Sequence, residues 1–132
     1  MKLPDCYGAP LADYYFLPGE ALLYVRWHGH LTGAAVIRGI REALELRRKY
    51  PYFKVLNDQH DTAGDWSEAL PWLQYEWLPQ AVAAGLRAVA GILSPDLEAK
   101  VANQKCMATI QLHCQSAVFA TLPEARAWLL AQ

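Results

Sequence analysis

Histidine and aspartate side chains follow two predicted strands in this sequence, and these residue types are the ones best suited to chemistry. His28 and His30 come directly after one predicted strand, and Asp58 and His60 come after the next. Imidazole and carboxylate groups together can bind a divalent metal ion. An aspartate beside a histidine can also act as an acid–base pair. The ends of these two strands are therefore the first place to look for a site.

The spacing of these residues matches none of the common catalytic or metal-binding motifs. The chain contains no HExxH, GxSxG, CxxC or Walker-type pattern. Polar residues are ordinary where a strand leaves a sheet, so this cluster needs no role beyond solvation. The sequence therefore predicts no enzyme, no metal ion and no cofactor. Whether His28, His30, Asp58 and His60 together bind a metal stays open at this point.

The elements that must position these residues alternate along the chain. Such alternation predicts a mostly parallel sheet with right-handed crossovers, in which the first strand pairs antiparallel at one edge. Proline, glycine and aspartate near the start predict an irregular N-terminal arm over residues 1–11. The predicted elements are strands over 12–17, 21–27, 52–57 and 86–93, helices over 32–50, 65–85, 95–103 and from 121 onward, and one or two strands within 107–119.

Capping residues indicate where several of these helices begin. Thr32, Ser94 and Thr121 are typical N-cap residues, because their hydroxyls can accept a hydrogen bond from a free backbone N–H. Pro95 suits the first position of a helix. Glu124 completes a capping box with Thr121.

Composition limits the class of protein and its compartment. The chain has 132 residues, 54% of them hydrophobic, and its 12 basic residues nearly balance 13 acidic ones. That balance argues against a nucleic-acid partner. No apolar run approaches the roughly 18 residues that span a bilayer, and no signal peptide is recognisable. Three widely spaced cysteines do not form a disulfide framework. The sequence thus predicts a cytoplasmic protein with no transmembrane segment.

One predicted helix carries more aromatic surface than a single core stripe needs. Trp66, Tyr75, Trp77 and Leu78 lie on it, and two prolines interrupt it. Aromatic residues at helical spacing usually belong to the core. Surplus apolar surface on a small domain is also typical of a homodimer face or an apolar cleft. These four residues are therefore a candidate ligand pocket or dimer face.

Several stretches of the chain share a pattern of strand ends and helix starts with a known family. These are Trp27–Thr32, Asp65-Trp66, Glu76-Trp77-Leu78-Pro79, Ala83–Leu86, Leu93-Ser94-Pro95-Asp96 and the ending from Phe119 to Leu129. Together they resemble small bacterial proteins of the SpoIIAA-like group, which belong to the STAS/SEC14-like class. The resemblance extends over nearly the whole chain after about Asp13. These stretches mark where strands end and helices begin, so they are more informative about the fold than about the function.

The resemblance implies an α/β fold with a mixed, mostly parallel sheet of four or five strands. About four helices would pack mainly on one face of that sheet. A single STAS/SpoIIAA-like domain would then occupy residues 1–132.

The resemblance also implies a regulatory loop after the third strand. In regulatory STAS domains, the anti-sigma factor antagonists, a serine or threonine in this loop is phosphorylated, which switches binding to a kinase partner. The corresponding loop here contains Asp61-Thr62-Ala63-Gly64. It lacks the usual serine and offers the hydroxyl of Thr62 instead. The candidate phosphoacceptor is therefore Thr62, and the regulatory loop also includes Asp58, Asp61 and Ser67.

Two functions from different classes follow from this resemblance. The first is a non-catalytic regulatory module, homodimeric and bacterial, that acts through contacts with a protein partner still to be identified. The alternative is a carrier for a small apolar ligand or lipid, with a pocket under the helix from Trp66 to Leu78, as SEC14-like relatives suggest.

Overall fold

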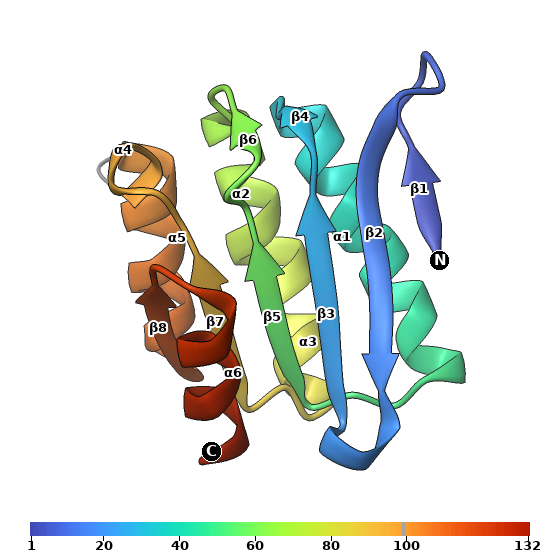
Figure 1. Cartoon of the computed structure of the whole chain (residues 1–132), viewed down its shortest axis with the longest axis vertical. Coiled ribbons are helices and arrows are strands. Elements are labelled where there is room, and N and C mark those ends of the chain that lie inside the picture. The colour runs from blue at the N-terminus through green and yellow to red at the C-terminus, as the bar shows by residue number, and fades with distance from the viewer. Residues whose placement is uncertain (99) are drawn as a thin grey trace.

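A mixed six-stranded sheet lies at the centre of the described part of the chain, which covers residues 1–98 and 100–132 of this computed structural model (Figure 1). The strand order is β1-β2-β3-β5-β7-β8. Strands β3, β5, β7 and β8 run parallel, whereas β1–β2 and β2–β3 pair antiparallel. The strands are β1 (Lys2–Pro4), β2 (Pro10–Leu17), β3 (Leu22–Trp27), β5 (Lys54–Asp58), β7 (Ala88–Ile92) and β8 (Gln115–Phe119).

Crossover helices connect the parallel strands, as the alternating pattern predicts. Helix α1 (Gly33–Lys49) connects β3 to β5, and helices α4 (Pro95–Glu98) and α5 (Val101–Gln111) connect β7 to β8. A further helical segment connects β5 to β7, and α6 (Leu122–Leu130) follows the last strand. Thr32 caps α1 by accepting the N–H of Ala35 at 3.2 Å. Ser94 accepts the N–H of Leu97 at 3.3 Å, and Thr121 accepts that of Glu124 at 3.4 Å. The N-cap predictions at Thr32, Ser94 and Thr121 are confirmed, whereas the helix predicted to be capped by Asp65 begins at Ser67 without a side-chain cap.

The helix with two prolines is one continuous run of different helical turns, called here the composite helix. It consists of η2 (Ser67–Ala69), α2 (Leu70–Trp72), the π-helical turn η3 (Leu73–Trp77) and α3 (Leu78–Ala83). Proline provides no N–H for the preceding turn, and a π-turn is a known way to absorb such a defect. Gly85 follows with a φ of 104°, a conformation that glycine adopts readily.

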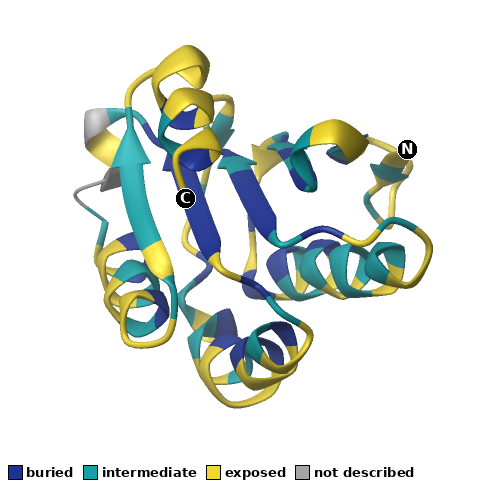
Figure 2. Ribbon diagram, turned by 90° about the horizontal axis from the view of Figure 1, so that it is seen from below, coloured by how far each residue is buried: buried dark blue, intermediate teal, exposed yellow. Residues whose placement is uncertain are grey.

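The helices cover the two faces of the sheet unequally (Figure 2). Helix α1, the composite helix and α5 pack on one face, where they form the larger core with Val25, Trp27 and Val55. Of the α-helices in the described residues, only α6 packs on the other face. A smaller core forms there from Leu22, Leu56, Ala88, Ala90, Ile92, Ala125 and Leu129. The predicted fold class, including helices packed mainly on one face, is confirmed.

Three details differ from the sequence-based predictions. The sheet has six strands in the described residues rather than four or five, because Lys2–Pro4 pairs with β2. The arm over 1–11 is therefore not irregular throughout. Ile110, expected in a strand, is buried in α5, which extends to Gln111. Within the described residues, no helix is both long enough and apolar enough to cross a bilayer.

Candidate functional site

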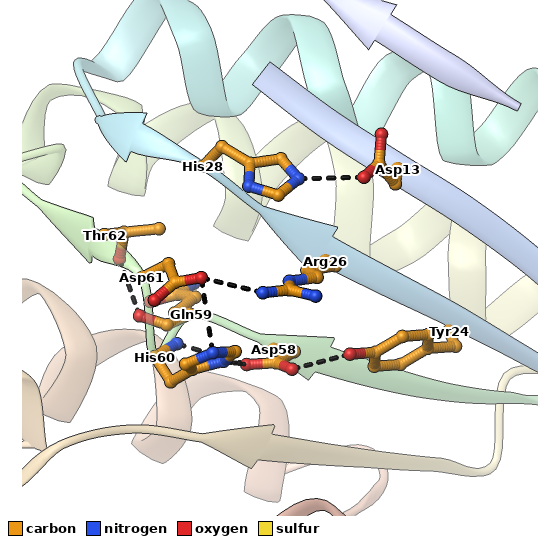
Figure 3. A network of polar contacts seen from close by, with 9 residues as sticks. All are labelled: Asp13, Tyr24, Arg26, His28, Asp58, Gln59, His60, Asp61 and Thr62. Carbon is orange, nitrogen blue, oxygen red and sulfur yellow. Dashed lines mark hydrogen bonds and ion pairs between the residues drawn. The ribbon is translucent and has the colours of Figure 1, made fainter. Parts of the chain in front are cut away.

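A network of charged side chains lies at the carboxyl ends of β3 and β5, on the face that carries α6 (Figure 3). Parallel strands bring their carboxyl ends to one edge of the sheet, where ligands of open α/β sheets gather. The short strands β4 (Gly29–His30) and β6 (Thr62–Ala63) pair beyond this edge and join the two loops. The topology therefore brings the predicted loops together.

Asp58 is the buried centre of the network, with only 3% of its surface exposed. Its Oδ2 accepts the hydroxyl of Tyr24 at 2.6 Å. Its Oδ1 accepts the backbone N–H of His60 at 3.1 Å and also contacts Nδ1 of the same ring. Both of its oxygens are occupied by the protein's own donors.

His60 and Asp61 extend the network towards solvent. The Nε2 atom of His60 lies 3.3 Å from Oδ2 of Asp61, which also accepts a 2.8 Å hydrogen bond from Arg26. The hydrogen bond from the Arg26 guanidinium lowers the pKa of Asp61, and the neighbouring His60 acts in the same direction. Burial, then the hydrogen bond to Asp58, raises the pKa of Tyr24. The loop after β5 is thus tied to β3 by ion pairs and hydrogen bonds.

The two histidines after β3 lie apart from this centre. His28 pairs with Asp13 of β2, with Nε2 and Oδ2 separated by 2.9 Å. His30 is exposed in β4, with its ring beside Gly64. No group of three or more histidine, cysteine, aspartate or glutamate residues in the described part of the chain is arranged to hold a metal ion. The structure therefore joins His60 to Asp58 but separates His28 and His30 from both.

Thr62 lies in β6 and is half-buried. Its hydroxyl donates to the carbonyl of Gln59 at 2.8 Å, and its N–H reaches the same carbonyl at 3.2 Å. Ser67 begins the composite helix, where its N–H donates to Oδ1 of Asp65 at 2.9 Å. That hydrogen bond lowers the pKa of Asp65. Thr62 and Ser67 therefore occupy different turns of the predicted regulatory loop.

The aromatic candidates divide between core and surface. Trp66, Trp77 and Leu78 are at most 8% exposed, whereas Tyr75 is 70% exposed. The three buried side chains expose little surface to solvent, so Tyr75 is the exposed member of the candidate ligand pocket or dimer face. A cavity of about 30 Å³ beneath Trp77 and Trp27 has room for roughly one water molecule.

A larger groove lies between the composite helix and α5. Its volume is about 280 Å³. The predicted pocket residues Trp77 and Leu78 line it, together with Leu73, Cys106 and Ile110. Ligand pockets are usually about 300–1,000 Å³, so this groove lies just below that range.

Three members of the network were not identified from the sequence, namely Asp13, Tyr24 and Arg26. Register explains their position, because Asp13 lies directly opposite Arg26 in the β2–β3 hairpin and Arg26 lies beside Asp58. The available signal was period-two patterning, in which polar residues alternate with the buried Tyr14, Val25 and Trp27 of these strands.

Comparison with known proteins identifies the family. The SpoIIAA-like family model matches residues 22–130. The chain belongs to the SpoIIAA-like family. The match includes β3, the loop after β5 and α6, and therefore most of the charged network. A comparison with curated proteins gave no match. The resemblance in the sequence is thereby confirmed, and SpoIIAA-like domains are generally interaction modules rather than enzymes.

Proposed function

We propose that this SpoIIAA-like chain is a non-catalytic regulatory module in the manner of the anti-sigma factor antagonists. It acts in the bacterial cytoplasm through contacts with a protein partner and with a second copy of itself. The observation that carries the proposal is the tie between the loop after β5 and β3, made by the Asp58–Tyr24 and Asp61–Arg26 contacts. These charged groups bind one another, which suits a switchable surface better than substrate chemistry.

Phosphorylation of Thr62 is the proposed switch. A phosphoryl group on Oγ1 removes the proton that this atom donates to the carbonyl of Gln59. It also places about two negative charges beside Asp61. Arg26, now paired with Asp61, is then drawn towards the phosphate, because guanidinium binds phosphate strongly. The tie between the loop and β3 is thereby rearranged, and the surface that a partner meets changes.

A phosphorylation assay with matched variants tests this switch. The chain is incubated with ATP and a kinase-containing lysate of its own source organism, and its intact mass is measured. Wild type and Ser67→Ala should each gain one phosphoryl group, whereas Thr62→Ala should gain none. Absence of a mass increase in wild type, or an unchanged increase in Thr62→Ala, contradicts the proposed role of Thr62.

A carrier for a small apolar ligand is the second candidate, supported by the groove of about 280 Å³ between the composite helix and α5. Native mass spectrometry of protein purified from its host tests it, because a retained lipid or small molecule adds a defined mass. Thr109 lies on the groove wall, so Thr109→Trp should displace such a ligand, with the exposed Tyr75→Trp as control. Protein that carries no added mass counts against this function.

A further inference from the structure

The two edges of the sheet differ in how they are protected against pairing with another strand. Natural edge strands are commonly short, charged, proline-containing or bulged. Strand β1 has all of these features, since Lys2 and Pro4 lie among its three residues and its register is irregular at Pro4. Strand β8 has five residues, Gln-Ser-Ala-Val-Phe, without a charge or a proline, and its register with β7 is continuous. The β8 edge therefore lacks protection.

The backbone groups that this edge exposes follow from the register. Gln115 donates to the carbonyl of Arg87 at 3.0 Å, and the carbonyl of Phe119 accepts from Leu93 at 3.2 Å. These two residues therefore face β7. Because successive residues of a strand point their N–H and C=O groups to opposite sides, Ser116 and Val118 face outward. The outward carbonyl of Ser116 accepts a 3.1 Å hydrogen bond from the side-chain amide of Gln111, and a pairing strand replaces that bond with one from its own backbone. No strand of the described chain lies on that side.

Helix α5 presents an uncharged flank beside this edge. Val101, Gln104, Ala108 and Gln111 follow helical spacing and form one stripe. Val101 is 60% exposed. A groove of about 260 Å³ separates this stripe from β8, and its lining includes Leu93, Met107 and Val118. An uncharged helix face thus lies beside the unprotected strand.

From these features we infer that a second copy of this chain binds at the β8 edge, with the two β8 strands antiparallel around a two-fold axis. Ser116 of one copy lies opposite Val118 of the other, so each pair exchanges two backbone hydrogen bonds. This inference rests on the proposed function, because it names the second copy as one partner of the module and places the contact.

Charge favours a second copy as the occupant. A two-fold axis brings each residue close to its own counterpart or to a near neighbour, so charged residues here would meet like charges. Neither β8 nor the α5 stripe carries a charge, whereas a helix such as α1 carries six charged side chains in its second half (Arg41, Glu42, Glu45, Arg47, Arg48 and Lys49). Val118 of the second copy then fills the groove beside Met107.

The proposed contact leaves the regulatory loop accessible. Strand β7 separates β5 from β8, so the loop with Thr62 stays free for its own partner.

Sedimentation of matched variants tests this contact. Wild type should sediment as a dimer. Val118→Pro removes an outward N–H without touching the ladder to β7, and Ala108→Glu puts two negative charges near the two-fold axis. Both variants should sediment as monomers with unchanged circular dichroism. Ala83→Glu adds the same charge at an exposed position of the composite helix and should leave the dimer intact.

Hydrogen exchange adds a readout that does not depend on Val118→Pro folding. The amides of Ser116 and Val118 should be protected in wild type and should lose that protection in Ala108→Glu. A wild type that is monomeric at millimolar concentration, or a dimer unaffected by Ala108→Glu, overturns the inference. These measurements use the purified chain alone, so a monomer that is still phosphorylated on Thr62 overturns the β8 contact and leaves the proposed regulation standing.

Discussion

At the scale of single residues, the charged network is organised around one buried carboxylate. Asp58 has lost nearly all contact with water, and a buried charge is tolerated only when it is hydrogen-bonded and paired. Tyr24 and His60 supply the donors. Their first effect is therefore to hold the loop after β5 in one conformation.

Tyr24→Phe tests this structural role. The substitution removes the hydroxyl that donates to Asp58 and leaves the ring, so it should lower the free energy of unfolding by about 1–3 kcal/mol. Urea unfolding measures the change. Tyr75→Phe is the matched control, because Tyr75 is 70% exposed and should change stability by less than about 0.5 kcal/mol. Equal effects of both substitutions would show that the hydrogen bond to Asp58 contributes little.

A second residue-scale prediction concerns alkaline pH. Burial raises the pKa of Tyr52 from 10.0 to about 12, and burial also raises the pKa of Tyr14. The folded state therefore keeps protons that the unfolded state releases. Their contribution to stability is complete below pH about 10 and is lost as pH rises towards 12. The free energy of unfolding should fall across that interval, and Tyr52→Phe should make the fall less steep. A slope unchanged in this variant contradicts the assignment.

Residue-scale prediction from the sequence worked where the cause is local. The cap at Thr32 is a contact over three residues, so the sequence pattern is sufficient to find it. The contacts of Asp58 with Tyr24 and of His28 with Asp13 span 34 and 15 residues. They depend on which strands pair and in what register, and that is decided by packing between segments far apart in the sequence rather than by neighbouring residues.

At the scale of elements, helix α1 packs closely on β3 because Gly39 has no side chain. A methyl group there would overlap the ring of Trp27 and approach the hydroxyl of Tyr14. That hydroxyl hydrogen-bonds the carbonyl of the same glycine at 2.5 Å. The helix therefore lies against the sheet at a distance that only glycine permits.

Gly39→Ala should accordingly destabilise the fold, although alanine is the better helix former by about 1 kcal/mol. Overlap with a packed tryptophan typically costs about 1–3 kcal/mol, and thermal or urea unfolding would measure it. Gly19→Ala serves as control, because an added methyl there meets no atom within 4 Å. A Gly39→Ala variant more stable than wild type would mean that the helix moves away from Trp27 at little cost.

The ends of helices and strands could be predicted where proline or capping residues mark them. The sequence between α5 and β8 lacks such signals, because Ile110 and Leu112 alternate with polar residues as they would in a strand. Packing of Ile110 and Ala102 in the larger core favours the helix instead. Strand β1 was missed for a related reason, since its hydrogen bonds come from β2 rather than from its own composition.

At the scale of the whole molecule, the two layers on the sheet differ in strength. Three helical segments share the larger core, whereas α6 rests alone on a core in which three of seven residues are alanines. The ion pair between Arg126 and Glu20 adds little, because Arg126 is half-exposed. Leu129 is the largest fully buried side chain of α6, and Ala125 and Trp128 pack beside it.

Hydrogen exchange should reveal this difference as separate opening of α6. Segments with few buried contacts open at lower free energy than the global transition, so the amides of α6 should exchange before those of α1. Leu129→Ala removes a buried side chain at a cost of about 2–5 kcal/mol and should accelerate exchange in α6 far more than in α1. Leu130→Ala, at a position 50% exposed, should change neither. Equal acceleration of both helices by Leu129→Ala would instead mean that the two layers unfold as one unit, and that the single helix is as firmly held as the three opposite it.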